Sequence, residues 1–533
     1  MRYIGPFFRM NSLSEKDIEG QLFYLSREAI KTIVLNSKCG ILSSFRASKK
    51  SSRTNNISIL NDFSPLICLY RKSSPIFIHN KSSHGFDESS FKKDISPTTN
   101  ALMTLALLNL SRYYSYYCDN NRNIDSLSEA YSYLSKEQLE FYYENLRNSE
   151  GIFVEKKNIS DGNAKGYNLI DKNKKFNFVD QAFMMNAYYL YAHDNPDDPS
   201  SEDYKNFSLQ ILDMFLDFKD LLYNLSFEDG CKILLSFNVL YNISKEEKCK
   251  SLIIDLSDFL ISKFDEKDYY IDSLDSASLF GLSLLDSFKH TGIETFKEKS
   301  NEIFQKLKEL YNDEKGVFTK LTDKKEIKYS SFDICFYFLF IFIGSKEKDN
   351  MFEYRGMISN LYRKYFISSG CIYSWPDAPT LDETERYRGL TLRSQDMLDE
   401  SYFRMPNVPS PESSGLAPLF AKNITYSKKK DTFSKPKDSF DSYRNLLIFF
   451  VFIHYFMDDI IKDMNFDVST DIPNKNSQPI ESIANSEPQK PKEDLKTDET
   501  ITNSESNESA TEKNSNDNSI KDIKNEKKSK KKS

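Results

Sequence analysis

The most constraining feature of the sequence is a set of segments that are apolar on almost every face yet too short to cross a membrane. Segment 332–343 reads FDICFYFLFIFI, and segment 446–457 reads LLIFFVFIHYFM. Both fall well short of the roughly 18 apolar residues that span a bilayer. A helix that is hydrophobic all round and does not lie in a membrane has to be enclosed by other protein. The chain is therefore predicted to contain helices that are buried on all sides.

Apolar segments of this kind alternate along the chain with amphipathic helical segments that carry a charged outer stripe. The apolar segments are predicted at 96–117, 178–193, 230–242, 274–290, 330–344 and 439–462. The amphipathic segments are predicted at 14–39, 126–148, 202–222, 246–264, 293–312 and 347–367. The pattern therefore predicts six inner and six outer helices.

The connections between these segments also alternate in length. Connections from an apolar to an amphipathic segment are short, such as 290–292, whereas most of those leading back are long, such as 368–438. Three of the long connections open with a similar glycine-containing turn, at Gly151, Gly316 and Gly370. Hairpins whose long loops all lie at one end are typical of a closed double ring. The predicted fold class is all-α, an (α/α)6 toroid of six helical hairpins.

An open solenoid of stacked helix pairs is the alternative architecture, since it also builds a continuous core. The apolar segments are more hydrophobic than the concave face of a solenoid, and neither terminal hairpin resembles a polar cap. Both observations favour the ring.

The predicted toroid domain runs from 14 to 464 and carries two insertions, 43–95 and 368–438. Within the first insertion, the apolar runs 65–70 and 75–79 are predicted to pair as a small hairpin.

A short N-terminal arm, 1–13, and a low-complexity tail, 465–533, flank the predicted domain. No aromatic residue follows Asp467, and Ser, Asn, Asp, Glu and Lys dominate this part of the sequence. Such a composition cannot bury enough apolar surface to offset the entropy of ordering, so the tail is predicted to be disordered. Its final KKSKKKS is interpreted as a solvated end, with a protein partner bound through the tail as the alternative.

Composition and motif content exclude several functional classes. A net charge of -7 gives no footprint of nucleic-acid binding. The seven cysteines are scattered and never form C-x-x-C, which is typical of reduced thiols in a cytosolic protein. The first residues lack the apolar region of a secretory signal, so a cytoplasmic protein without a membrane association is predicted. With no H-x-x-x-H and no nucleotide-binding motif, no metal and no cofactor is predicted.

Carboxylates are expected at the rim where the long loops meet the N-termini of the inner helices. Asp180 and Asp333 begin two of these helices, and Asp399 and Glu412 lie in the last long loop. Paired carboxylates about 5–9.5 Å apart perform acid–base chemistry on glycosidic bonds. We predict Asp180, Asp399 and Glu412 as catalytic residues. The alternative for the helical aspartates, with Asp275, is a capping or first-turn role, because helix N-termini favour negative charge.

Aromatic and charged side chains near the same rim are candidates for substrate binding. Trp375, Tyr373 and Tyr402 offer flat faces on which sugars stack, or else form a lid packed on its own core. Arg393 is one of several arginines interleaved with acidic residues. This pattern indicates either an ion-pair network that fixes the loop or a clamp for an anionic substrate. Asp333 completes the predicted binding set.

With these features in place, the chain resembles the six-hairpin glycosidase-like superfamily, which includes glucoamylase-type hydrolases and sugar 2-epimerases. The resemblance is carried by Gly-[Ile/Val]-Phe turns that precede an Asp-bearing inner helix: Gly151-Ile152-Phe153 before Asp180, and Gly316-Val317-Phe318 before Asp333. The resemblance implies a carbohydrate ligand bound at the rim.

A narrower passage is similar to the helical part of spermatogenesis-associated protein 20-like proteins. Arg393, Asp399 and the run PSPESS at 409–414 look like the R…D…P-S-x-N-S passage of that family. Here Glu412 stands near the position of the family's Asn. No C-x-x-C precedes Ser96, so the thioredoxin-like domain of those proteins is not expected in this sequence.

Two functions are therefore expected. The first is a carbohydrate-active toroid, a glycoside hydrolase-like enzyme that uses paired carboxylates on a carbohydrate or other small ligand. The alternative is a non-catalytic toroid that binds a protein or a glycan.

Overall fold

The computed structural model describes residues 14–44, 57–73, 77–80, 83–116, 122–160, 166–173, 175–322, 324–348, 351–376, 417–434, 436 and 439–469. The chain divides into two units, Met1–Ile472 and Pro473–Ser533. The second unit, the predicted arm 1–13 and most of the predicted tail lie outside the described residues.

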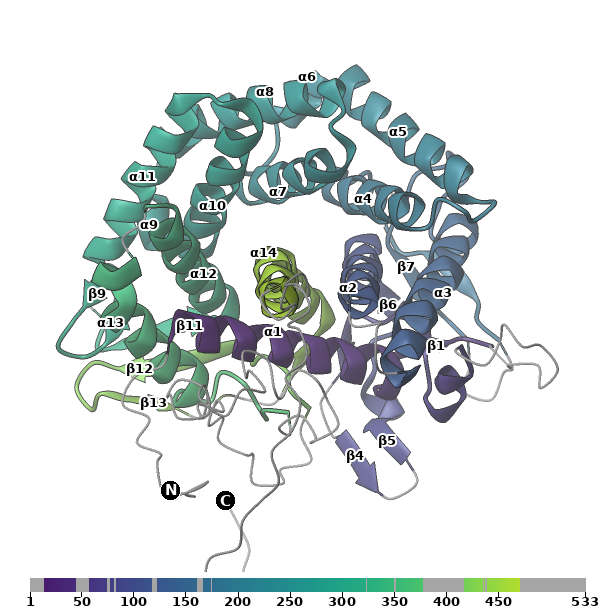
Figure 1. Ribbon diagram of the computed structural model, residues 1–533, viewed down its shortest axis with the longest axis horizontal. Helices are drawn as coiled ribbons and strands as arrows, with labels where there is room; N and C mark the ends of the chain where they lie inside the picture. Colours follow the sequence, from purple (N-terminus) through teal and green to yellow (C-terminus); the bar gives the residue numbers. More distant parts are fainter. Residues whose placement is uncertain are drawn as a thin grey trace, which may run out of the picture. The chain divides into compact units, whose positions relative to one another are not determined.

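The first unit is a double ring of helices (Figure 1). Among the described residues, the inner ring consists of α2 (Pro97–Ser115), α4 (Phe178–Asp194), α7 (Phe227–Ser244), α10 (Leu274–Thr291), α12 (Ser331–Glu347) and α14 (Ser442–Ser469). The outer layer consists of α1 (Glu15–Lys31), α3 (Arg122–Asn145), α5 (Ser201–Asp217), α8 (Glu247–Asp265), α11 (Glu294–Glu309) and α13 (Met351–Leu361). Short helices α6 (Lys219–Leu222) and α9 (Tyr269–Asp272) lie in the connections.

The inner ring is closed. Each inner helix contacts the next in the order α2, α4, α7, α10, α12 and α14, and α14 returns to contact α2. The first outer helix, α1, packs against α14 and also meets α13, so the two ends of the folded chain adjoin. A solenoid would leave these ends apart. The predicted all-α (α/α)6 toroid is confirmed.

The inner helices form because their residues can bury on every side. In α12 every residue from Ser331 to Ser345 is buried, and the helix begins with a capping box between Ser330 and Asp333. Aromatic side chains meet between neighbouring inner helices, as Phe342 of α12 does with Phe456 of α14 at 5.5 Å between ring centroids. Burying one such side chain stabilises the fold by about 1.5–3 kcal/mol.

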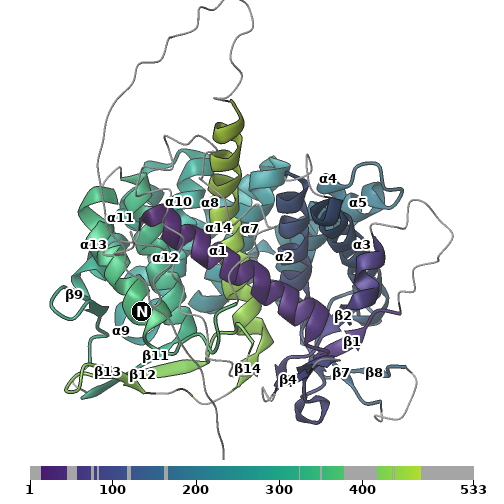
Figure 2. The ribbon, with the colours of Figure 1, turned by 60° about the horizontal axis from the view of Figure 1, so that its bottom comes forward.

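The long connections form short antiparallel strands that gather along one end of the ring, the lower edge in Figure 2. The strand pairs are β1 (Gly40–Leu42) with β2 (Leu66–Leu69), β3 (Lys72–Ser73) with β14 (Phe440–Asp441), β4 (Phe77–Asn80) with β5 (Ser83–Phe86), and β9 (Tyr311–Asn312) with β10 (Val317–Phe318). One three-stranded sheet consists of β6 (Asp94–Ile95), β7 (Lys156–Asn158) and β8 (Leu169–Asp171). Another consists of β11 (Glu326–Ser330), β12 (Asn423–Ser427) and β13 (Thr432–Ser434).

One local prediction was wrong. The runs 65–70 and 75–79 do not pair with each other. Strand β2, within the first run, pairs with β1, and β4, which overlaps the second run, pairs with β5. The tight approach of β1 explains this choice, because a Cβ on Gly40 would lie 1.9 Å from the carbonyl oxygen of Cys68. Glycine is the residue that permits two backbones to come this close.

The repeated glycine turns share one backbone conformation. Gly151, Gly316 and Gly370 have φ values of 83°, 63° and 71°. This left-handed region is strained for residues that carry a Cβ. Each turn follows an outer helix and redirects the chain into the strand-bearing end of the ring.

Candidate functional site

The N-terminal turns of the inner helices face the strand-bearing end of the ring, which we call the mouth. The side chains of Lys232 from α7 and Tyr443 from α14 meet there, with the Lys232 Nζ atom 5.6 Å from the centroid of the Tyr443 ring. Helices α7 and α14 are three positions apart in a ring of six. The contact therefore crosses the ring axis and fills part of the centre of the mouth.

Lys232 is a largely buried cation held by acids of its own helix. Its Nζ atom donates to Glu228 at 2.7 Å and lies 3.5 Å from Asp229. Burial by itself lowers the pKa of Lys232, but Tyr443, Glu228 and Asp229 together raise it above its ordinary value. The ammonium group is therefore charged at neutral pH. Because it is largely buried, its electrostatic interaction with a nearby charge is stronger than it would be in water.

The opposite side of the mouth carries a second cation. The guanidinium carbon of Arg444 lies 4.2 Å from the centroid of the Phe332 ring, which in turn contacts Tyr443 edge-on. Within the part of the chain that the structure describes, the buried Nε and Nη1 atoms of Arg444 have no hydrogen-bond partner. An unpaired buried donor is costly. Arg444 is therefore suited to bind an oxygen-rich group that enters the mouth.

Two aspartates from neighbouring inner helices lie at the same mouth. Burial, reinforced by the nearby charge of Asp333, raises the pKa of Asp275 to about 6. Asp275 accepts a hydrogen bond from the backbone N–H of Ser276 at 2.9 Å. Asp333 is more strongly engaged, because its Oδ2 atom accepts from the backbone N–H of Ser330 and from the Lys320 Nζ atom, each at 2.7 Å. The two carboxyl groups thus occupy different environments.

Asp180 caps a helix other than its own. Its Oδ1 atom accepts from the backbone N–H of Thr98 at 2.9 Å and from the Thr98 hydroxyl at 2.5 Å, in the first turn of α2. The N-cap residue of α2, Ser96, forms no side-chain cap hydrogen bond. Burial raises the pKa of Asp180 to about 6, against the opposing effect of the two Thr98 hydrogen bonds.

The predicted aromatic residues hold the start of the long loop against the ring. Trp375 is 7% exposed and meets Tyr362 edge-on, with the ring centroids 6.4 Å apart. The Tyr373 hydroxyl accepts a hydrogen bond from the backbone N–H of Ser439 at 3.0 Å. Little of the Trp375 ring is thus free to stack on a ligand.

Four of the predicted site residues lie outside the described residues: Arg393, Asp399, Tyr402 and Glu412. The described ends of their loop are joined, because the backbone N–H of Ala421 donates to the carbonyl of Cys371 at 2.7 Å. The second end is tied to α14, where the Asn445 side chain accepts from the backbone N–H of Phe420 at 2.7 Å. Both ends of the loop therefore begin beside the mouth.

Lys232 and Arg444 were not among the residues predicted from the sequence. A usable signal was present, since Lys232 is the only charged residue in the predicted apolar segment 230–242. A single Lys or Arg near the start of a helix that is otherwise buried all round needs a partner or a ligand.

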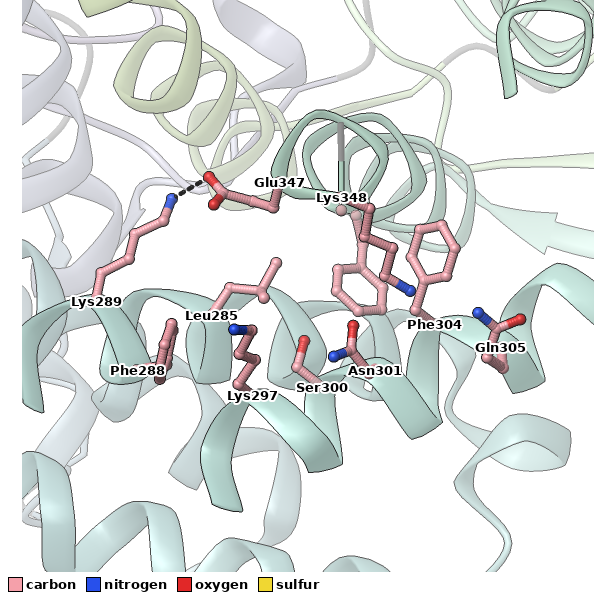
Figure 3. Close-up of a pocket in the computed structure, with 12 residues that line it drawn as sticks. Leu285, Phe288, Lys289, Lys297, Ser300, Asn301, Phe304, Gln305, Glu347 and Lys348 are labelled. Atoms are coloured by element: carbon pink, nitrogen blue, oxygen red, sulfur yellow. Dashed lines mark ion pairs between the residues drawn. The ribbon is translucent and has the colours of Figure 1, made fainter. Parts of the chain in front are cut away.

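Pockets of moderate size occur among the described residues, and two of them are compared with the mouth. One of about 220 Å³ lies at the mouth end, lined by Arg71, Lys72, Lys92, Asp94 and Lys172. The other, of about 340 Å³, is lined by α11 and by the C-terminal halves of α10 and α12 (Figure 3). The ion pair between Lys289 and Glu347, 2.6 Å long, spans one side of this second pocket. Its lining residues on α10 lie ten or more residues beyond Asp275, so the second pocket is remote from the mouth.

No metal centre and no membrane-spanning element occur among the described residues. No group of three or more His, Cys, Asp or Glu side chains is arranged to hold a metal ion. None of the helices in the described ranges is long and apolar enough to cross a membrane.

Among the comparisons with known proteins, only the one with solved structures found similar proteins. No family model and no curated protein sequence matches the chain. Similar structures include a D-mannose isomerase, with 8% identity, a TM-score of 0.47 and coverage of 83% of this chain and 98% of that one. Cellobiose 2-epimerase from Bacillus thermoamylovorans B4167 has 11% identity and a TM-score of 0.41, covering 68% and 89% of the two chains. The GH76 α-mannanase from Bacteroides thetaiotaomicron has 10% identity and a TM-score of 0.38, covering 70% and 91%.

The chain has the six-hairpin toroid fold. This statement rests on the closed order of inner helices, because similarities at such scores carry no information on substrate or mechanism. The narrower resemblance to spermatogenesis-associated protein 20-like proteins falls on residues 393–414, outside the described residues, and stays a prediction.

Proposed function

We propose that this six-hairpin toroid is a carbohydrate-active enzyme that cleaves a glycosidic bond at its mouth, with Asp275 as the general acid. The supporting observation is that burial and the charge of Asp333 raise the pKa of Asp275 to about 6. An acid is most effective when its pKa lies near the working pH. Glycosidases use a carboxylic acid of raised pKa beside a second carboxylate.

In this proposal Asp275 donates its proton to the oxygen of the leaving sugar. The second carboxylate is supplied by Asp333, on the neighbouring helix, or by one of the residues predicted from the sequence, Asp180, Asp399 and Glu412. It acts as a nucleophile or activates a water molecule. Lys232 and Arg444 donate hydrogen bonds to hydroxyl oxygens of the bound sugar and so position it. The residues predicted to contact the substrate around these groups are Tyr373, Tyr402, Arg393 and Trp375.

The test is a comparison of single variants on a panel of oligosaccharides. Asp275→Asn should lose at least about 100-fold in turnover, the range associated with a general acid. Asp333→Asn, Asp180→Asn, Asp399→Asn and Glu412→Gln then identify the partner carboxylate. Asp197→Asn, an exposed position in a connection, is the matched control. Unchanged turnover in Asp275→Asn would remove the assignment.

A second function is favoured by one specific observation. Both Asp180 and Asp333 are engaged in capping helices, and Trp375 is buried. A mouth whose carboxylates serve the fold suits a toroid that binds a glycan without cleaving it. Binding of an oligosaccharide that survives prolonged incubation intact would favour this function over hydrolysis.

A further inference from the structure

The smaller pocket at the mouth end is built almost entirely from cations. Its lining residues are Arg71, Lys72, Lys92, Asp94 and Lys172, and its volume is about 220 Å³. They come from the first and second long connections, whose strands β6, β7 and β8 form one small sheet. The position of the pocket is fixed by backbone contacts rather than by flexible side chains alone.

Arg71 ties the pocket to the mouth. Its carbonyl oxygen accepts from the backbone N–H and the hydroxyl of Ser442, the first residue of α14, at 3.1 Å and 2.9 Å. Its own backbone N–H donates to the carbonyl of Asp94 at 2.8 Å. Smaller contributions to the pKa of Asp180 come from Glu155, which raises it, and from Arg71, which lowers it. The pocket therefore lies within electrostatic reach of a carboxylate of the candidate site.

The charges in the pocket do not balance. Lys172 pairs with Asp94 at 3.0 Å and with Glu155 at 3.6 Å, and Arg71 pairs with Glu155 at 3.3 Å. Among the lining residues and their ion-pair partners, four cations thus face two carboxylates, an excess of 4 − 2 = +2.

The two remaining lysines are held opposite each other. Lys72 and Lys92 are antiparallel bridge partners, and the backbone N–H of Lys92 donates to the carbonyl of Lys72 at 2.9 Å. Asp441 of β14 is a further antiparallel partner of Lys72, but among the described residues neither ammonium group has a carboxylate within ion-pair distance. Like charges placed directly opposite in a strand pair are destabilising. An anion between them would convert this cost into a binding contribution.

We propose that this pocket binds the phosphoryl group of a phosphorylated sugar whose sugar ring occupies the mouth. The proposal rests on the proposed function for the sugar, and on the pocket alone for the anion. A phosphate monoester carries a charge of about −1.5 to −2 at neutral pH and three acceptor oxygens, which match a site of net charge +2. A carboxylate brings a single charge and two oxygens. Lysine is a common phosphate ligand that acts as a point charge.

The experiment measures binding by calorimetry, with inorganic phosphate, glucose 6-phosphate, glucose and glucuronate as probes. The wild-type chain should bind glucose 6-phosphate and inorganic phosphate, and should bind glucuronate at least tenfold more weakly. Lys72→Ala/Lys92→Ala should weaken both phosphate probes at least tenfold. The control Lys205→Ala/Lys306→Ala removes the same charge from exposed positions on α5 and α11 and should bind as the wild type does.

Equal loss of affinity in both double variants would mean that net charge alone drives binding, and the proposal would fall. Equal affinity for glucuronate and glucose 6-phosphate would overturn the assignment of phosphate. Unfolding curves without ligand should superimpose for the two double variants. Repeating the titration on Asp275→Asn separates the two proposals, since phosphate binding there does not require turnover.

Discussion

Lys232 of α7 and Tyr443 of α14 touch across the axis of the ring, with the ammonium nitrogen 5.6 Å from the centre of the phenol ring. The two helices face each other from opposite sides of the inner ring. Burial raises the pKa of Tyr443, while the ammonium group of Lys232 opposes this effect. The phenol is therefore neutral at pH 7 and can donate a hydrogen bond to a ligand.

Replacing Lys232 should separate function from stability. In Lys232→Met the alkyl stem remains and the charge is lost, so we expect oligosaccharide binding or turnover to fall at least tenfold. The free energy of unfolding should change by no more than about 1 kcal/mol or rise, because an apolar side chain often replaces a buried charge without loss. Lys248→Met, at an exposed position on α8, is the control. Urea denaturation and glycan titration check both expectations, and a large loss of stability in Lys232→Met would contradict them.

Asp286 should make the fold less stable as the pH rises from about 4 to about 6. This carboxyl group of α10 accepts from the hydroxyl of Tyr455 on α14, and burial raises its pKa from 3.8 to about 6. In that interval the folded chain retains a proton that the unfolded chain has lost, so the free energy of unfolding falls with increasing pH. A difference of about two pKa units corresponds to about 3 kcal/mol at most.

Asp286→Asn should remove this contribution. The measurement is the free energy of unfolding of the wild type and of Asp286→Asn at pH 4, 5, 6 and 7. The wild type should lose stability relative to the variant across this range. Asp197→Asn, at an exposed position, should follow the wild type in parallel. Parallel curves for Asp286→Asn as well would show that the carboxyl does not titrate in this window.

The cap that Asp180 supplies to α2 can be weakened without touching the carboxylate. Thr98→Val keeps the shape of the side chain and the backbone donor but removes the hydroxyl that donates to Asp180. We expect a loss of about 1–3 kcal/mol in the free energy of unfolding and a further rise in the pKa of Asp180. Thr98→Ser retains the hydroxyl and should preserve most of the stability. Chemical denaturation of the three proteins measures the difference; identical curves for the Val and Ser variants would argue against the cap.

Close packing between inner helices predicts a different result for two glycine substitutions. A Cβ on Gly281 of α10 would lie 2.5 Å from the ring of Phe340 on α12, whereas a Cβ on Gly356 of α13 would meet no atom within 4 Å. Gly281→Ala should lose about 1–3 kcal/mol through overpacking. Gly356→Ala should gain about 0.5–1 kcal/mol, because alanine is the better helix former. Thermal unfolding of both variants decides; stabilisation by both would mean that the α10–α12 contact is loose.

The ring was predictable because its inner and outer helices have different hydrophobicity patterns in the sequence. A helix such as α12 shows no polar face at all, whereas α11 has a single apolar stripe, and their alternation determines which layer each joins. The strands were not predictable in the same way. Strands β3 and β14 have two residues each and are far apart in sequence, so no local pattern indicates their pairing.

The candidate site was predictable in part. The expected position of Asp180 and Asp333 in first turns is confirmed, since both lie in the first turn of inner helices. That Asp180 caps α2 rather than α4 depends on the packing of two helices, which sequence spacing does not report. The raised pKa of Asp275 has the same origin, because burial and Asp333 act together there only after α10 and α12 have packed side by side.

The contact between α1 and α14 also bears on biosynthesis. Residues 15–31 are made early, yet the helix against which they pack is formed by residues 442–469. Contacts between such distant parts of a chain form late and slow the folding reaction. Until α14 emerges from the ribosome, the apolar flanks of α2 and α12 have no neighbour on that side and are prone to aggregate. A nascent chain of this kind is expected to need a chaperone until its last helix has been translated.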